Sequence, residues 1–412
     1  MKYLFRSFFL IGVIGSILCR CAPSSFQIDA DFPGGNIMVM NINGDTVQLQ
    51  QDLRDTEGHW FYWSFRIRGA AGRTLNFKFT NGTVLGSRGP AVSNDGGLTW
   101  RWLSELGASG TTFQYHFGAK ENEVYFSGGM NYTEKDLHRF LIKYKNHPDL
   151  TIETLCTSRK GRKVELLRIH NKSQAADYKI FLSSRHHCGE MMATRALEGI
   201  MEVVLADTEE GRWFRSHADF FIVPFVDKDG VEDGDQGKNR RPHDHNRDYI
   251  QHIYPEIRAI TEQVPQWSEG KPLFFFDLHC PWIREGSDGN DPNKGTNEFV
   301  YFVGRNPEID TGNFEEKLLR FSSILETAKK GAIPYKASYN LLYGKAWNTA
   351  SNIPSPDLLN SAGWGATLPN AIFSSSIEIP FANASGVEVN TDSARKLGYD
   401  LAKAIRVYLE NY

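Results

Sequence analysis

Four short segments of this 412-residue chain carry side chains whose types could serve one reaction. Each segment lies at or near the end of an apolar, strand-like run; they are His187-Cys188-Gly189-Glu190, Asn246-Arg247, Asp277-Leu278-His279 and Ile377-Glu378-Ile379. Together they offer two imidazoles and a carboxylate as metal ligands, a cationic clamp for an anion, and one more carboxylate. A catalytic zinc ion needs three protein ligands and an open position, and a carboxylate can accept the proton of an attacking water molecule. The set predicts metal-assisted hydrolysis.

The predicted metal ligands are His187, Glu190 and His279. A histidine and a glutamate three residues apart are weak evidence, because that spacing is common by chance. Glu190 could instead be a carboxylate favoured by a helix N-terminus, and His279 alone could be a satisfied core histidine. Asp277 points to the same face of the strand as His279, where it would hold the imidazole by a hydrogen bond. The combination favours one zinc ion.

Three other clusters could compete for the metal ion. His186 adjoins His187, but its side chain should point elsewhere if His187 and Glu190 share an ion. The segment His243-Asp244-His245 is interpreted as a solvated loop. The acidic residues between positions 227 and 235 lack the ligand spacing of an EF-hand, so they are interpreted as a solvated turn.

The segment around positions 237–249 is rich in planar donors, which suit carboxylates and stay charged when partly buried. It predicts that an anionic substrate group binds beside the metal site. The alternative, ion pairs with the acidic loop upstream, fits Arg241 better than Arg247. Glu378 lies in an apolar strand, where an unpaired carboxylate is costly. It is interpreted as the proton acceptor, with a buried salt bridge as the alternative.

Strand-like runs broken by turns predict a β-sandwich between about positions 36 and 126, with Trp63, Phe65 and Ile67 alternating onto one face. Thr133 to Asp136 resembles a capping box that opens a helix. Beyond Thr151, strands alternate with helices, and continuous apolar runs such as residues 273–276 are typical of strands buried on both faces. We therefore predict an antiparallel β-sandwich followed by an α/β domain with a mixed, mostly parallel central sheet and helices on both faces. Active sites of such sheets lie outside the carboxyl ends of the strands.

The predicted elements of the second domain can be stated by range. The strands are expected at Val164–His170, Tyr178–Ser183, Asp219–Val226, Leu273–His279, Phe299–Val303 and Ile372–Ile379. The helices are expected at Glu190–Leu205, Tyr249–Glu262, Phe314–Lys330 and Thr391–Leu409. The predicted domains span residues 22–148 and 149–412.

The first residues have the pattern of an export signal. Lys2 and Arg6 precede an apolar run over positions 8–18, which is too short to span a bilayer. Cleavage after Cys21 would remove residues 1–21, and a lipid anchor on Cys19 or Cys21 is the alternative. Export to a periplasmic or extracellular location is therefore expected, with or without a lipid anchor.

Charge and cysteine content exclude other classes. The formal net charge is −3 with no basic block, so nothing supports nucleic-acid binding. Beyond the signal, Cys156, Cys188 and Cys280 remain, which is no disulfide framework. Cys188 and Cys280 are expected to be small buried residues rather than a bridge.

These segments, in this order, resemble the zinc carboxypeptidases of the carboxypeptidase A clan, most closely the branch of the cytosolic carboxypeptidases. The resemblance covers residues from about 150 to 412 and extends to the front domain, because that branch carries an N-terminal β-domain. It implies one zinc ion and the following roles: His187, Glu190 and His279 as ligands, Asn246 and Arg247 on the substrate's terminal carboxylate, Arg240 polarising the carbonyl, and Glu378 as proton acceptor. The family's substrate-capping tyrosine has no clear match; Tyr339, Tyr343 and Trp364 are candidate substitutes.

The resemblance implies hydrolysis of the C-terminal peptide or isopeptide bond of peptides or proteins. One alternative is an amidase or deacylase on the same scaffold, acting on N-acyl amino acids or peptidoglycan peptides. Another is a glycan- or peptide-binding protein with a vestigial zinc site, whose binding surface would use Trp60, Trp63, Trp100 and Trp102. The intact metal ligands and Glu378 favour an enzyme.

Overall fold

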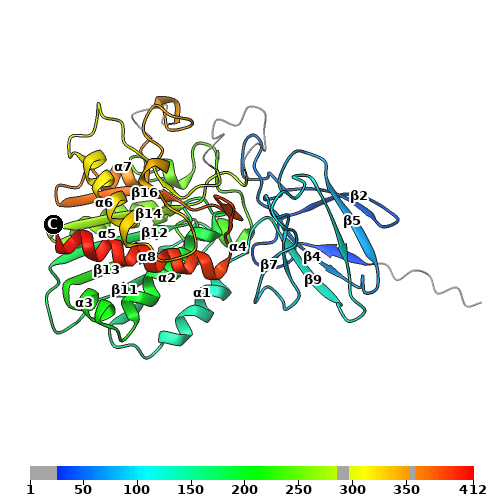
Figure 1. Cartoon of the computed structure of the whole chain (residues 1–412), viewed down its shortest axis with the longest axis horizontal. Coiled ribbons are helices and arrows are strands. Elements are labelled where there is room, and N and C mark those ends of the chain that lie inside the picture. The colour runs from blue at the N-terminus through cyan, green and yellow to red at the C-terminus, as the bar shows by residue number, and fades with distance from the viewer. Residues whose placement is uncertain (1–25, 285–296, 353–357) are drawn as a thin grey trace, which may run out of the picture.

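The computed structural model describes residues 26–284, 297–352 and 358–412. The predicted signal segment at 1–21 lies outside these residues. Two bodies lie side by side: a β-domain made by the first strands and a larger α/β domain that contains the C-terminus (Figure 1). The predicted division at position 148 falls between α1 (Glu134–Leu141), with the 3₁₀ turn Ile142–Tyr144 after it, and β10 (Leu150–Thr157).

The β-domain is a sandwich of two sheets. One sheet has the strand order β1-β4-β9-β6-β7, from Gln27–Asp29, Ser64–Arg68, Glu123–Ser127, Ala91–Ser93 and Arg101–Trp102. The other has the order β2-β3-β5-β8, from Met38–Asn43, Thr46–Gln50, Thr74–Phe79 and Thr112–His116. Pairing is antiparallel except between β3 and β5. The alternation predicted for Trp63, Phe65 and Ile67 is confirmed, because all three are buried between the sheets.

A capping box opens the helix that follows the sandwich. Thr133 is the N-cap of α1, and its backbone N–H donates to Asp136 Oδ2 over 3.0 Å. This reciprocal capping satisfies backbone groups that the first helical turn leaves without partners. The helix predicted from the sequence is confirmed.

The central sheet of the second domain has seven strands in the order β10-β11-β13-β12-β14-β16-β15. After β10, the strands are β11 (Lys163–Ile169), β12 (Tyr178–Ser184), β13 (Ala218–Val223), β14 (Leu273–His279), β15 (Tyr301–Phe302) and β16 (Ala371–Glu378). The four inner strands β13, β12, β14 and β16 run parallel, and the outer strands pair antiparallel. The mixed, mostly parallel character of the predicted sheet is confirmed.

Helices cover both faces of this sheet (Figure 1). Along β14, Phe274 and Phe276 pack into one core, and Phe275 packs into another on the opposite face. The period of two follows from the alternation of side chains along a strand. The helices are α2 (Met191–Leu205), α3 (Glu209–His217), α4 (Lys228–Asp233), α5 (Pro255–Ser268), α6 (Phe314–Ala328), α7 (Ser361–Gly365) and α8 (Thr391–Glu410).

Three predicted helices agree with α2, α6 and α8, but the helix predicted from Tyr249 begins later, at Pro255. The carboxylate of Asp248 accepts hydrogen bonds from the backbone N–H groups of Ile253 and Tyr254, at 2.9 and 2.8 Å. These bonds hold the preceding residues in a turn and leave the proline at the first helical position, where it needs no N–H donor. The outer strand β10 was not predicted, because its largely exposed residues lack a continuous apolar run.

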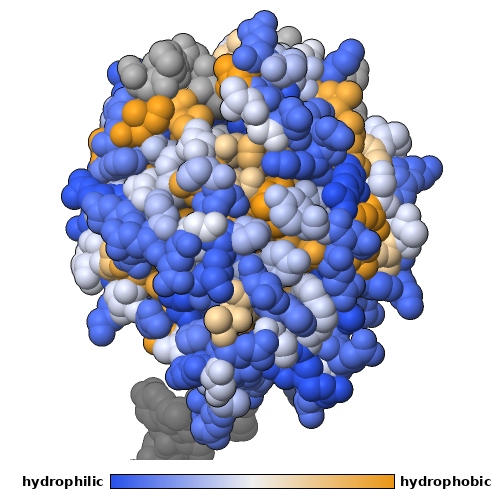
Figure 2. All heavy atoms as spheres, turned by 90° about the vertical axis from the view of Figure 1, so that its left-hand side faces the viewer, coloured by the Kyte–Doolittle hydropathy of each residue, from blue (hydrophilic) through white to orange (hydrophobic). Residues whose placement is uncertain are grey.

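The minor elements complete the chain. They are the hairpin β17 (Asn383–Ala384) with β18 (Val387–Glu388), and short 3₁₀ turns at His245–Arg247, Ala337–Tyr339 and Ala350–Asn352. The face seen in Figure 2 is mainly hydrophilic, with apolar side chains in small separate groups. Within the described ranges, no helix has the length and apolar content needed to cross a membrane.

Candidate active site

The three predicted metal ligands converge at the carboxyl ends of the parallel strands. The Nδ1 atom of His187 lies 3.0 Å from Oε1 of Glu190, and Nδ1 of His279 lies 2.8 Å from Oε2 of the same carboxylate. Ligand atoms of all three side chains lie within 4.8 Å of one another. His187 and Glu190 come from the segment between β12 and α2, and His279 ends β14.

Each imidazole presents its other nitrogen to a carboxylate. Nε2 of His279 lies 2.7 Å from Oδ2 of Asp277, as expected from the sequence, and Nε2 of His187 lies 3.7 Å from Oδ1 of Asp244. The carboxylate of Asp277 can hold the proton of His279 on Nε2, which leaves the lone pair of Nδ1 for a metal ion. The contact between His187 and Asp244 is longer than a hydrogen bond. Two imidazoles with their Nδ1 atoms turned to one carboxylate are a donor set that suits zinc.

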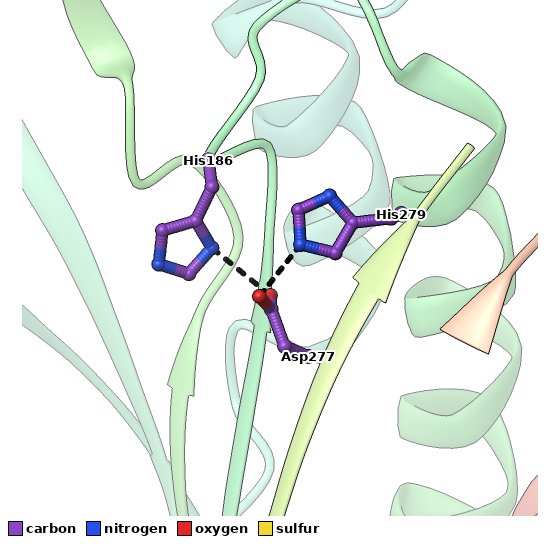
Figure 3. Close-up of side chains that lie close together, drawn as sticks. All are labelled: His186, Asp277 and His279. Atoms are coloured by element: carbon purple, nitrogen blue, oxygen red, sulfur yellow. Dashed lines mark hydrogen bonds and ion pairs between the residues drawn. The ribbon is translucent and has the colours of Figure 1, made fainter. Parts of the chain in front are cut away.

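Asp277 also contacts a second buried histidine, His186. Its Oδ1 lies 3.0 Å from Nδ1 of His186, so one buried carboxylate bridges two histidines (Figure 3). Nε2 of His186 in turn lies 2.7 Å from the hydroxyl of Tyr249. The prediction that His186 points away from the ion site of His187 is therefore confirmed.

The charges of these groups stabilise one another. Burial raises the pKa of Glu190, but Lys238, His187 and His279 outweigh burial and hold that pKa well below its ordinary value. Burial lowers the pKa of His279, yet Asp277 and Glu190 raise it well above the usual range. The attraction between carboxylates and imidazoles is large because the groups are buried, where charges are weakly screened. The same negative charge would favour a divalent cation.

Glu378 differs from Glu190 in its environment. It ends β16 as the cross-strand neighbour of His279, and its Oε2 atom is buried without a hydrogen bond in the described part of the chain. Burial raises its pKa to about 7, and Glu190 adds to the shift, although His279 and Lys238 oppose it. A carboxylate with a pKa near neutrality can exchange a proton readily, as a general base requires.

Arg247 is a cation held by neutral groups. Its guanidinium donates to the backbone oxygen of Asn352 at 3.3 Å, to the side-chain Oδ1 of Asn352 at 3.0 Å, and to the backbone oxygen of Asn246 at 2.8 Å. Among the described residues, no carboxylate lies within ion-pair distance of Arg247. Asn246 is fixed by a hydrogen bond of 2.9 Å from the backbone N–H of Ser361 to its Oδ1. This pair is therefore available for an anionic ligand group.

Arg240 is not brought to the metal ligands. Its guanidinium makes three ion pairs, with Asp227 at 2.7 Å, Asp55 at 2.9 Å and Asp235 at 3.2 Å. These carboxylates hold its pKa above the ordinary value despite burial. The three carboxylates already occupy the donors of this guanidinium. The position of Arg240 therefore gives no support to the expectation that it polarises a substrate carbonyl.

A cavity of about 400 Å³ joins the predicted residues. It is lined by the predicted metal ligands His187 and His279, by Asn246, Arg247 and Glu378, and by Lys238, Asp244, His59, Trp60, Trp282, Tyr301 and Trp347. Tyr339, Tyr343 and Trp364, the candidate substitutes for the substrate-capping tyrosine, are not among the described residues that line the cavity. The sequence analysis assigned no role to Lys238 or Asp244, because it treated Lys238 only as part of a donor-rich segment and interpreted Asp244 as part of a solvated loop.

Two segments that were predicted to be solvated are buried or half-buried. His243, Asp244 and His245 have exposed fractions of 5, 8 and 3%. The acidic segment forms α4 and its flanks, where Asp229 pairs with Arg162 at 2.8 Å and Asp235 pairs with Arg54 at 2.9 Å. Both predictions were wrong. Arginines distant in sequence neutralise the acidic segment, whereas His243 contacts Asp248 at 2.8 Å and His245 stacks on the ring of Tyr254. Cys188 and Cys280 are free and buried, as expected.

Comparison with family models agrees with this geometry. The model described as zinc carboxypeptidase matches residues 137–274, and the model described as cytosolic carboxypeptidase N-terminal domain matches residues 28–128. The first match contains His187, Glu190, Asn246 and Arg247. It ends before His279 and Glu378, which only the tertiary structure places beside them.

Curated relatives match over parts of their length. Cytosolic carboxypeptidase 2 of Homo sapiens is 29% identical over 181 residues, which are 41% of this chain and 20% of that protein. An uncharacterised protein of Zymomonas mobilis is 26% identical over 265 residues, which are 62% of this chain and 67% of that protein. The match to cytosolic carboxypeptidase 2 of Macaca fascicularis spans 24% of that protein.

Solved structures share the whole architecture. A metallo-carboxypeptidase from Burkholderia cenocepacia superposes with a TM-score of 0.72 at 18% identity, over 94% of this chain and 99% of that one. A metallo-carboxypeptidase from Pseudomonas aeruginosa, solved with (2-guanidinoethylmercapto)succinic acid, gives a TM-score of 0.70 at 23% identity, over 93 and 99% of the two chains. At these identities the likeness establishes the fold, with the β-domain in front of the α/β domain.

Proposed function

We propose that this chain is a zinc-dependent carboxypeptidase acting on the C-terminal peptide or isopeptide bond of peptides and proteins. The comparisons support the proposal, because residues 137–274 match the zinc carboxypeptidase model and residues 28–128 match the cytosolic carboxypeptidase N-terminal domain. One observation carries the proposal. A single cavity is lined by two of the three convergent candidate ligands, by a buried carboxylate with a raised pKa, and by an arginine that makes no ion pair within the described part of the chain.

Zinc would be held by His187, Glu190 and His279, and when bound it would activate a water molecule and polarise the scissile carbonyl. Glu378 takes the proton of the attacking water and passes it to the leaving amine. Its burial suits both steps, because a pKa near 7 lets one carboxyl group accept and donate.

Asn246 and Arg247 bind the free carboxylate of the substrate. Arg247 makes no ion pair with the described residues, although its charge interacts with Asp244, and a guanidinium can hold a carboxylate through two parallel hydrogen bonds. This contact fixes the chain end so that the last carbonyl lies beside the metal ligands. It therefore restricts the reaction to C-terminal residues, and positioning of this kind is a large part of catalysis.

The test uses purified protein loaded with zinc, and mass spectrometry to follow release of the last residue from peptides that end in a free or an amidated carboxyl group. We expect release from the free ends, loss of activity after chelation, and recovery on adding zinc. Glu378→Gln should retain zinc while turnover falls by at least about 10²-fold. A chelator-insensitive activity, or unchanged turnover of Glu378→Gln, would refute the proposal.

The same assay separates an amidase or deacylase from a carboxypeptidase. N-acyl amino acids and peptidoglycan peptides also carry a carboxylate beside the scissile amide, so Arg247 would serve either substrate. Faster release of acyl groups than of C-terminal amino acids would assign the protein to that second activity. Of the four tryptophans proposed for a binding protein, Trp63 and Trp102 are buried and cannot stack on a ligand, whereas Trp60 lines the cavity.

We also propose that the protein is exported. The support is the sequence pattern of Lys2, Arg6 and the apolar run over positions 8–18, which lie outside the described residues. Cell fractionation with mass spectrometry of the mature N-terminus would test it. An intact N-terminus on protein found in the cytoplasm would contradict it.

A further inference from the structure

We infer that Lys238, rather than Arg240, binds the oxygen of the scissile carbonyl as negative charge develops on it. The inference rests on the proposed function. Among the described residues, the lysine and arginine side chains that line the cavity are Lys238 and Arg247. Hydrolysis at a chain end needs one positive contact for the terminal carboxylate and another for the oxygen that gains charge. The cavity therefore holds one cation for each task.

The two cations have different neighbours. Arg247 is held by Asn352 and the backbone of Asn246, away from ion pairs. Lys238 instead lies on the side of the reacting groups, where its Nζ atom is 2.7 Å from Oε1 of Glu190. Its charge also interacts with Glu378. A substrate whose carboxylate lies on Arg247 would thus direct its last carbonyl toward the region where Lys238, Glu190 and Glu378 meet.

Lys238 can make further contacts. An ammonium group has three N–H donors, and the described structure gives this one a single hydrogen-bond acceptor, Glu190. The ammonium also lies over the ring of Trp60, 4.9 Å from its centroid. The aromatic wall keeps the group partly dehydrated, and a charge in such surroundings stabilises an oxyanion more strongly than it would in water.

The backbone around Lys238 is fixed by the N-terminal domain. Asp55 accepts hydrogen bonds of 2.9 Å from the backbone N–H groups of both Gln236 and Gly237, and the N–H of Glu57 donates to the carbonyl of Asn239 over 3.1 Å. Gly237 has φ +78°, and a Cβ atom there would lie 2.5 Å from the backbone nitrogen of Cys188. The loop is therefore held against the metal-ligand segment, with Lys238 directed into the cavity.

The test compares three variants of the full-length zinc-loaded protein. Lys238→Met removes the charge and keeps the length, Lys238→Arg keeps a cation, and Arg241→Met is the control, because Arg241 belongs to the same loop but is 81% exposed. The measurements are kcat and KM on a peptide with a free C-terminus, zinc content, and the affinity for a phosphinic peptide, whose tetrahedral anionic group imitates the charged oxygen.

Lys238→Met should lower kcat by about 10²- to 10³-fold with little change in KM. It should weaken binding of the phosphinic peptide by about 10²-fold and leave both zinc content and affinity for the released amino acid unchanged. Lys238→Arg should recover at least part of both losses, and Arg241→Met should behave like the wild type.

Two results would overturn the inference about Lys238. Wild-type kcat in Lys238→Met would show that the charge is not used, and loss of zinc from that variant would show that Lys238 supports Glu190 instead. Either result leaves the proposed carboxypeptidase intact as long as the wild type releases C-terminal residues. A wild-type protein that neither binds zinc nor releases them would refute both.

Discussion

Replacing Asp277 with asparagine probes the layer that holds the metal ligands. The carboxylate is fully buried and meets three donors: the hydroxyl of Ser183 at 2.8 Å, Nδ1 of His186 at 3.0 Å and Nε2 of His279 at 2.7 Å. An asparagine of the same shape has one oxygen and one NH₂ group. If the oxygen keeps Ser183 and His186, the NH₂ group faces His279 and favours the tautomer that carries its proton on Nδ1.

In that tautomer Nδ1 carries the proton, so it has no free lone pair to bind zinc. Loss of a carboxylate behind a histidine ligand weakens metal binding by about 10- to 100-fold, which corresponds to about 1.4 to 2.8 kcal/mol. The protein should still fold, because the side chain keeps its volume and two of its hydrogen bonds. Competition with a chromophoric chelator measures the zinc affinity, and urea unfolding of the metal-free protein verifies that the fold is intact.

The matched control is Asp177→Asn. Asp177 lies 2.7 Å from Nδ1 of His217, the same distance as in the Asp277–His279 pair, but its side chain is 60% exposed and does not touch the cavity. Its zinc affinity should equal that of the wild type. If Asp277→Asn binds zinc as tightly as the control, the carboxylate does not set the tautomer of His279, and the reasoning fails.

Three other outcomes follow from the same geometry. Glu378 must be ionised to accept a proton, and burial raises its pKa from 4.5 to about 7. Because bound zinc favours the ionised form, kcat/KM should rise with pH along a limb whose midpoint lies between these two values. A pH–rate profile that falls between pH 4 and 8 would contradict this. Arg247→Gln should raise KM at least about tenfold for peptides with a free C-terminus and leave KM for amidated peptides unchanged. Equal effects on both peptides would show that Arg247 does not bind the terminal carboxylate. Arg240→Met removes the cation shared by the buried Asp227 and Asp235 and the half-buried Asp55, and it should lower the free energy of unfolding by about 3–5 kcal/mol. An unchanged urea midpoint would show that the ion pairs contribute nothing.

Much of the fold was predictable because its signals are local. The alternation over Trp63, Phe65 and Ile67 identified a half-buried strand, and the apolar run before Asp277 identified a strand buried on both faces. Helix boundaries were less accurate where a side chain changed the backbone partners. Asp248 holds the turn before Pro255 in a way that no periodicity records.

The convergence of His187, Glu190 and His279 was also predictable from sequence, because parallel strands bring their carboxyl ends to one edge. The sequence by itself thus determined the elements, their layering and the residues at the strand ends. It could not determine which cation faces the cavity. That choice depends on Asp55 and Asp227, which are distant in the chain and together bind Arg240, whereas Lys238 lines the cavity. Only the tertiary structure decides such pairings, because the energy of a buried charge depends on partners that are distant in the chain.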